Sequence, residues 1–260
     1  MENPRAETDC EGRRRSVRLV NEHRVLTRLT EDQNRELMEL NRDLEKRVRH
    51  RTRQLGENEE ALKKSLVQLR KTLEATIQAL ALTAEARDPY TAGHQRRVAD
   101  LSRAIAQKMG LSQDQVEGVR MAGSIHDLGK IYVPSEILNK PGKIRETEFE
   151  LVKSHPQVGY EILKTIDFPW PVAEIELQHH ERLDGSGYPN GLKGDEILME
   201  SRIVAVADVV ESMSSHRPYR PALGVEKALE EIMSGRGRFY DERVVDACLS
   251  VFREDDYLLQ

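Results

Sequence analysis

The sequence predicts an all-α protein in which one long helix precedes a bundle of shorter helices. Residues 13–71 are dense in Arg, Lys and Glu and contain no proline and a single glycine, Gly56. Beyond residue 80, Gly and Pro punctuate segments whose apolar residues recur every three or four positions. No segment longer than a short piece alternates apolar and polar residues as a half-buried strand would. These three observations favour packed helices over a sheet.

The long helix carries an apolar seam. From Leu55 onward a seam that fits heptad a and d positions can be followed through Leu62, Leu66, Leu69, Leu73 and Leu80. The seam is imperfect, because Thr52, Glu59 and Thr76 also fall on or near it. Leu37 and Leu44 fall out of this register, as a stutter would produce. We expect a basic flexible leader over residues 1–30 and a coiled-coil linker or dimerisation helix over residues 31–74. The alternative is a charged helix that packs on its own domain.

The remaining chain, residues 75–260, is expected to be one helical domain. Its first apolar face, Val98 to Met109, is closed by Gly110 as a helix C-cap, and Ser112 is placed to cap the next helix. Further helices are expected at 146–153, 158–166, 172–178, 201–213 and 225–233. The run 204–207 would also suit a buried strand, but its small and apolar flanks favour a buried helix.

Composition excludes several classes of protein. The chain has 260 residues, of which 38% are hydrophobic and 33% charged, and its net charge of −5 gives no reason to expect a nucleic-acid partner. No apolar run approaches the roughly 20 residues that cross a bilayer, so no membrane partner is expected. Cys10 and Cys248 lie far apart and suggest free thiols in a reducing compartment. A cytoplasmic protein is the best interpretation.

Histidines and aspartates in separate segments form a candidate metal site. His126 and Asp127 follow the apolar run 121–125, and Asp208 lies within another. Burying a carboxylate is costly unless a metal or hydrogen bonds compensate it, so these residues are expected to meet at one place. The full candidate set is His94, His126, Asp127, His155, His179, His180 and Asp208. Imidazole and carboxylate without thiolate are ligands of a hydrolytic or redox-active centre, not of a structural zinc knuckle.

Longer motifs give these residues a family context. They are His126-Asp127-Leu128-Gly129-Lys130, the run His-His-Glu-Arg-Leu-Asp-Gly-Ser-Gly-Tyr-Pro at 179–189, and Arg217-Pro218-Tyr219-Arg220. Asp88-Pro89-Tyr90-Thr91 before His94 and Lys140-Pro141-Gly142 before His155-Pro156 also match. Over residues 75–250 the chain resembles an HD-GYP domain, a subclass of the HD metal-dependent phosphohydrolase superfamily. The resemblance implies an HD-type helical bundle around a metal centre.

The resemblance also implies a reaction, which is hydrolysis of the second messenger cyclic di-GMP to linear pGpG and in some members on to GMP. By position, all seven candidates correspond to metal ligands, with Asp127 as the usual bridge between metals. Lys130 corresponds to a residue near the metals and the scissile phosphate. Asp184 and Tyr188 of the Gly-Tyr-Pro loop, together with Arg217 and Arg220, correspond to substrate-binding positions.

The number of metals is expected to be two. Family members with three metals carry a carboxylate four residues before the first ligand histidine, where this chain has Tyr90. Two divalent cations bridged by Asp127 can activate a shared water as hydroxide and clamp both oxygens of a phosphodiester. Fe or Mn is expected by resemblance, although this ligand set also suits Ni, Co and Zn.

The expected partners are cyclic di-GMP, a second copy of the chain through the N-terminal helix, and an upstream receiver or sensor or a diguanylate cyclase. Two alternatives stay open. The chain could be a phosphodiesterase for another cyclic dinucleotide. It could also be a binding module that docks a partner, with slow or no catalysis.

Overall fold

The computed structural model describes residues 4–85, 87, 93–140, 142–215, 222–255 and 257–259, with side chains from residue 18 onward except that of residue 20. The chain divides into two units, Met1–Leu69 and Arg70–Gln260, which are described separately. Within the described ranges every regular element is helical, and β-structure is limited to two isolated bridges, Asp184 with Lys193 and Arg236 with Tyr240. The predicted all-α class is therefore confirmed.

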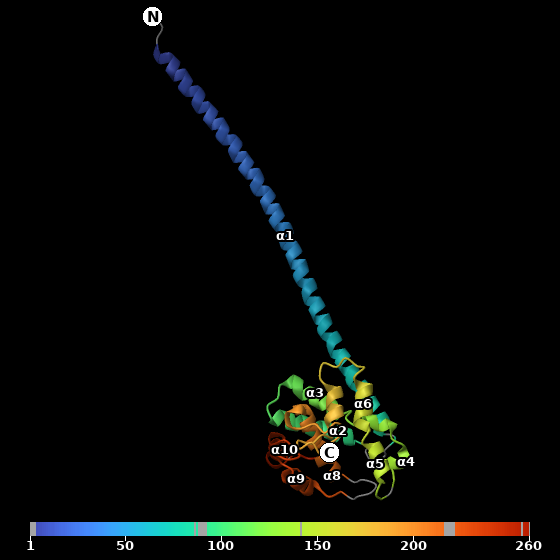
Figure 1. Ribbon diagram of the computed structural model, residues 1–260. Coiled ribbons are helices and arrows are strands. Elements are labelled where there is room, and N and C mark those ends of the chain that lie inside the picture. Colours follow the sequence, from blue (N-terminus) through green and yellow to red (C-terminus); the bar gives the residue numbers. More distant parts are fainter. Residues whose placement is uncertain are drawn as a thin grey trace. The chain divides into compact units, whose positions relative to one another are not determined.

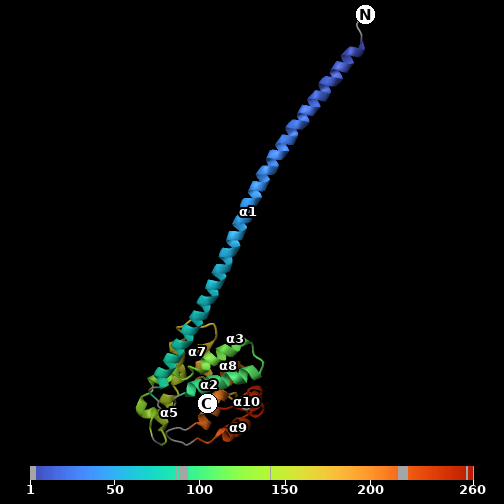
Figure 2. The same ribbon diagram turned by 180° about the vertical axis from the view of Figure 1, so that it is seen from behind.

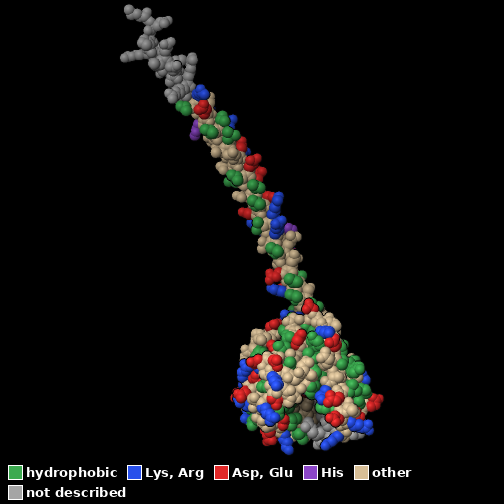
Figure 3. All heavy atoms as spheres, viewed as in Figure 1, with side chains coloured by type: hydrophobic (Ala, Val, Ile, Leu, Met, Phe, Trp, Pro, Cys, Tyr) green, Lys and Arg blue, Asp and Glu red, His purple; other side chains and the backbone are tan. Residues whose placement is uncertain are grey.

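The first unit is the N-terminal part of helix α1, Pro4–Glu85. The expectation of a separate leader over residues 1–30 is wrong for residues 4–30, because the helix already begins at Pro4. Pairs such as Arg18 with Glu22, 3.0 Å apart at i and i+4, show how a charged, proline-free segment continues a helix without a buried face. Among its described side chains, hydrophobic and charged residues alternate along the surface (Figure 3).

The apolar seam of α1 is solvent-exposed from Leu55 to Leu69, whereas Leu73 is partly buried against the core of the second unit. Leu55, Leu62 and Leu69 have exposed fractions of 69%, 60% and 66%. The coiled coil stays a prediction, since no second chain is present to cover these leucines. None of the helices in the described ranges combines the length and apolarity needed to cross a membrane.

The second unit is a bundle of short helices (Figures 1 and 2). In chain order they are α2 His94–Lys108, α3 Gln113–Gly123, η2 Leu128–Tyr132, α4 Ser135–Leu138, α5 Glu146–Val152, α6 His155–Leu163, α7 Val172–Gln178, η3 Gly194–Glu196, α8 Met199–Ser214, α9 Val225–Ser234 and α10 Glu242–Glu254. All the helices predicted for this region are present. The sequence did not predict α10 or the short elements η2, α4 and η3. Ser112 caps α3 as expected, accepting a hydrogen bond from the backbone N of Gln115 at 3.3 Å.

Helix α8 forms the centre of the core. Its side chains Ile203, Val204, Val206 and Val210 are fully buried, and it packs against α2, α3, α7, α9 and α10. Within α8 the run 203–207 is buried and apolar on every face, which explains why this part also resembled a buried strand. Cys248 of α10 is a free, buried thiol in the same core.

The last turns of α1 belong to this second unit. Ile77, Ala81 and Ala84 are buried, with exposed fractions of 3%, 7% and 6%, and Ile77 and Ala84 join the hydrophobic core. The core therefore fixes the end of α1 at Glu85, eight residues before α2 is capped by Gly93.

Candidate metal centre

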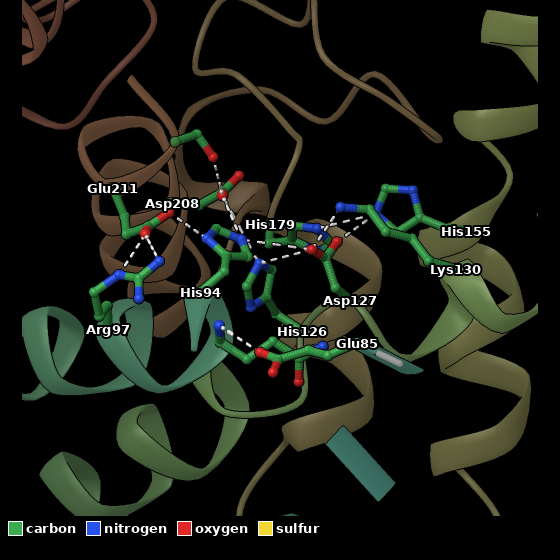
Figure 4. A network of polar contacts seen from close by, with 12 residues as sticks. Glu85, His94, Arg97, His126, Asp127, Lys130, His155, His179, Asp208 and Glu211 are labelled. Atoms are coloured by element: carbon green, nitrogen blue, oxygen red, sulfur yellow. Dashed lines mark hydrogen bonds and ion pairs between the residues drawn. The ribbon is translucent and has the colours of Figure 1, made fainter. Parts of the chain in front are cut away.

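All seven side chains predicted as metal ligands lie in the described residues and converge on one place. His94 opens α2, His155 opens α6, and Asp208 lies on α8. His126 and Asp127 occupy the turn between α3 and η2, just after α3 ends at Gly123. His179 is the C-cap residue of α7, and His180 follows it. Figure 4 shows six of these side chains pointing toward one another from separate elements.

The side chains form two groups that share Asp127. His94, His126 and Asp127 form one, and Asp127 with His155, His179 and His180 forms the other; in each, the ligand atoms lie within 4.8 Å of one another. Asp208 Oδ1 lies 3.3 Å from His94 Nε2 and 3.8 Å from His126 Nε2, so it adjoins the first group.

The two oxygens of Asp127 face different groups. Its Oδ2 lies 3.5 Å from His94 Nε2, whereas its Oδ1 lies 3.4 Å from His155 Nε2. A carboxylate placed in this way can ligate two cations at once.

The histidine rings are oriented for ligation through Nε2. In His126, His155 and His179, Nδ1 lies 2.9, 2.7 and 2.6 Å from the carbonyl oxygen three residues earlier. A proton on Nδ1 makes each of these hydrogen bonds, which leaves the Nε2 lone pair for a metal. His126 Nε2 is buried and has no hydrogen-bond partner among the described residues. The residues present therefore fit a metal ion.

His94 is held differently, by a carboxylate that the sequence analysis missed. Its Nδ1 contacts Oε2 of Glu211, a fully buried side chain on α8. Arg97 Nε and Ser215 Oγ both donate to Glu211 Oε1 at 2.7 Å. Burial raises the pKa of Glu211, but the contact with His94 outweighs burial and lowers that pKa to about 2. The sequence feature that could have identified Glu211 is its position three residues after Asp208, on the same face of an apolar helix.

The ionisation states of the second group suit metal binding. Burial raises the pKa of Asp127, but the charge of Lys130, together with a hydrogen bond from His94, outweighs burial and holds that pKa well below its usual range. Burial lowers the pKa of His155 to about 4 and holds that of His179 well below its usual value. At neutral pH the carboxylate is therefore charged and the imidazoles are neutral, as metal ligands must be.

Excess negative charge surrounds His94. Burial lowers its pKa, but hydrogen bonds with Asp127, Asp208 and Glu211 outweigh burial and raise the pKa to about 10. A proton on His94 thus balances these carboxylates in the chain alone. A bound cation would supply that positive charge instead and leave Nε2 as a ligand.

Lys130 lies beside the shared carboxylate. Its Nζ donates to Asp127 Oδ2 at 2.6 Å. The turn that carries both residues packs at backbone distance on α6, because a Cβ on Gly129 would lie 1.9 Å from the carbonyl oxygen of His155. Only glycine fits at this position.

The Gly-Tyr-Pro loop folds back on the second group. A Cβ on Gly187 would lie 2.4 Å from the backbone N of Arg182, so this close approach requires glycine. The ring of Tyr188 lies 4.7 Å from that of His180, between centroids. The buried carboxylate of Glu181 accepts from the backbone N of the loop residues Asn190 and Leu192 at 2.7 and 3.0 Å. Glu181 therefore shapes the loop.

The remaining predicted substrate positions are less defined. The exposed Asp184 accepts from Ser186 N at 3.0 Å and Ser186 Oγ at 2.6 Å, and lies 3.5 Å from Arg238 Nε. These contacts lie within and beside its own loop, so a role toward substrate stays a prediction. Tyr90, Arg217 and Arg220 lie outside the described residues.

The helical bundle brings together five histidines and two aspartates, and one of these aspartates, Asp127, is shared by both histidine groups. Such a site defines a metal-binding helical domain. Residues 24–244 match the HD domain family. The chain belongs to that family, which confirms the superfamily expected from the sequence motifs.

Individual relatives are also similar to this chain. The chain is 42% identical over 193 residues to the cyclic di-GMP phosphodiesterase response regulator RpfG of Xanthomonas campestris pv. campestris, covering 74% of this chain and 51% of that protein. It is 36% identical over 191 residues to 3′3′-cGAMP-specific phosphodiesterase 2 of Vibrio cholerae serotype O1, covering 73% of this chain and 37% of that protein. The chain thus spans about half, or less, of these relatives.

A solved structure supports the fold. Bd1817, described as an HDG"Y"P protein from Bdellovibrio bacteriovorus, superposes with a TM-score of 0.52 at 21% identity, covering 62% of this chain and 51% of that one. At this identity the similarity concerns the fold alone.

Proposed function

We propose that this chain is a metal-dependent phosphodiesterase of the HD-GYP subclass that hydrolyses cyclic di-GMP to linear pGpG. The observation that carries the proposal is the position of Asp127, whose two oxygens face two separate histidine groups. Such an arrangement suits displacement at a phosphodiester, where attacking and leaving oxygens both need stabilisation. The 42% identity to a cyclic di-GMP phosphodiesterase supports this choice of substrate.

The cofactors in this proposal are two divalent metal ions, Fe or Mn. One would be held by His94, His126 and Asp208, the other by His155, His179 and His180, with Asp127 shared between them. Bound there, such ions supply Lewis acidity that activates water and neutralises phosphate charge. A donor set made up of imidazole nitrogens and carboxylate oxygens is compatible with either metal.

Lys130 and Tyr188 act beside these ligands. The ammonium group of Lys130 orients Asp127 and is placed to attract an anionic phosphate oxygen. Burial, together with the charges of Asp208 and Asp127, raises the pKa of Tyr188, so its hydroxyl keeps its proton at neutral pH and can donate a hydrogen bond.

The test is product formation from cyclic di-GMP by protein purified without oxygen and loaded with Fe²⁺ or Mn²⁺. We expect linear pGpG from the wild type and from His50→Ala, which removes an exposed histidine of α1. His126→Ala should reduce turnover to background, because it removes a buried Nε2 of the first group. Absence of linear product from the metal-loaded wild type would overturn the proposal.

A second candidate substrate is 3′3′-cGAMP, favoured by the 36% identity to a phosphodiesterase specific for it. Comparing kcat/KM for the two dinucleotides on one preparation decides between them. Binding of either one with turnover no faster than that of Asp127→Ala would instead favour a binding module.

We also propose a homodimer through α1 and control by an upstream receiver, sensor or cyclase partner in the cytoplasm. The exposed seam at Leu55, Leu62 and Leu69 supports the dimer, because a second copy in register would cover these leucines. The response-regulator name of one relative supports upstream control.

A further inference from the structure

Glu85, the last residue of α1, caps the helix that carries His94. Its Oε2 accepts from the backbone N of Gly93 at 3.1 Å, and its Oε1 accepts from the backbone N of Gln95 at 3.2 Å. These two amides belong to the residues on either side of His94. The carboxylate thus fixes the backbone around a metal-ligating position from outside the ligand set.

Helix α2 lacks a side-chain cap of its own. Its N-cap residue is Gly93, with φ of 72°, and its first turn contains no acidic residue. The first N–H groups of a helix have no partner within the helix and carry partial positive charge, so an acceptor or anion there is stabilising. Glu85, at the end of the preceding helix, supplies both the hydrogen-bond acceptor and the negative charge.

Glu85 in turn depends on these donors. Its exposed fraction is only 8%, and a carboxylate buried to this extent is costly unless it is hydrogen-bonded. Its backbone is held because Ile77, Ala81 and Ala84 are buried in the last turns of α1. The Glu85 carboxylate therefore joins a fixed helix end to the first turn of α2.

His94 is restrained from two sides. Glu85 holds the backbone on either side of it, and Glu211 holds Nδ1 of its ring. The histidines of the other group use backbone carbonyls of their own segments at His155 and His179. Loss of the Glu85 cap should therefore disturb one metal group and spare the other.

We propose that Glu85 is a positioning residue that sets the place of His94 and thereby links the end of α1 to the first metal group. This inference rests on the proposed two-metal centre. A conformational change at the end of α1 would then alter the position of one metal, because the two hydrogen bonds of Glu85 hold the backbone on either side of His94.

The test is stepwise binding of Co²⁺ and Mn²⁺ to metal-free full-length protein, with the Co²⁺ absorption spectrum as a second readout. Glu85→Ala should weaken one of the two binding steps by about tenfold, the lower range for residues that orient ligands. It should also change the absorption of that Co²⁺ and leave the other step unchanged. Glu85→Gln keeps one acceptor oxygen and should fall between Glu85→Ala and wild type.

Ser112→Ala is the matched control, because it removes the cap of α3, a helix that ends before His126. It should lower Tm without altering either binding step. Equal weakening of both steps by Glu85→Ala, or no change in either, would overturn the inference. If Glu85→Ala does not fold, the same criteria apply to Glu85→Gln.

The two proposals fail in different ways. Wild-type protein that binds both metals and forms pGpG, with a Glu85→Ala variant identical to it in metal binding, overturns only the role of Glu85. Wild-type protein that binds no metal overturns both. A third result is that the wild type binds two metals, Glu85→Ala weakens only one binding step, and the wild type does not hydrolyse cyclic di-GMP. This result overturns the proposed function and supports the positioning role of Glu85.

Discussion

Gly159 of α6 faces Glu176 of α7 so closely that a Cβ on Gly159 would lie 1.9 Å from Glu176 Oε1. A Cβ on Gly129 would meet the carbonyl oxygen of His155 at the same distance, and the backbone N of Gly159 at 2.6 Å. Helix α6 therefore packs against the backbone of η2 and against the Glu176 side chain of α7. This packing brings Asp127, His155 and His179 together from three separate elements.

Gly159→Ala should disrupt the second metal group. The new Cβ would have to displace Glu176, whose carbonyl oxygen accepts from His179 Nδ1 at 2.6 Å. We expect a loss of stability of about 1–3 kcal/mol, typical of overpacking, and weaker binding at one metal step. Thermal unfolding and Mn²⁺ titration measure both effects. Gly56→Ala is the control, since a Cβ there meets nothing within 4 Å; an equal response of both variants would contradict the packing argument.

Glu176→Gln should change how stability depends on pH. Burial, together with the charge of Asp127, raises the pKa of Glu176 well above its usual value. The folded chain then retains a proton that the unfolded chain releases, so this residue lowers stability as pH rises above about 4.3. Gln has no such proton. In metal-free protein, Tm of Glu176→Gln minus Tm of wild type should grow from pH 4 to pH 8, and a pH-independent difference would refute this.

Asp127→Ala should affect both metals, unlike any single histidine substitution. Its two oxygens face the two groups, so its removal takes a ligand from each. We expect both binding steps to weaken and turnover to fall to background. Metal titration checks this, with His155→Ala as the comparison that should weaken one step more than the other. Selective loss of a single step in Asp127→Ala would argue against the shared carboxylate.

Lys130→Ala should separate catalysis from metal binding. The ammonium group contacts Asp127 Oδ2 and does not itself ligate a cation. We expect turnover to fall by about 10²–10³-fold, as for loss of one charge-stabilising donor. Metal content, measured on the same samples, should stay near that of the wild type. Loss of metal in proportion to activity would show that Lys130 acts only by supporting Asp127.

The double substitution Leu55→Lys and Leu62→Lys should abolish the proposed dimer, because it places charge on the seam of α1. Light scattering of the wild type should give twice the chain mass of 29.8 kDa, and the variant should give the chain mass itself. Gln54→Lys with Asn58→Lys adds the same charge off the seam and should stay dimeric. A wild type with the mass of a monomer would contradict the proposed dimer.

The sequence was sufficient to predict the all-α class and the seven side chains that converge at the site. Helical periodicity is local, and histidines and aspartates in apolar runs such as Ile203–Val210 need a shared reason to be buried. Glu211 and Glu85 could not be predicted in their roles, because each acts on His94 through contacts set by packing. Glu211 reaches it across 117 positions, and Glu85 lies at the end of a different helix.

One other expectation shows where local patterns fail. Residues 4–30 read as a leader because they lack a clear apolar stripe, yet they are helical, which needs only suitable propensity and the absence of breakers. The role of Asp184 toward substrate, expected from its motif, stays a prediction. The structure shows that its carboxylate forms a turn with Ser186, a local role common for aspartate in loops.

The most direct test of the binuclear phosphodiesterase is metal content per chain together with cyclic di-GMP turnover, measured on one sample purified without oxygen. Two metals per chain with linear pGpG as product is the predicted result. Two metals per chain without hydrolysis, or hydrolysis that survives complete removal of metal by a chelator, would contradict it.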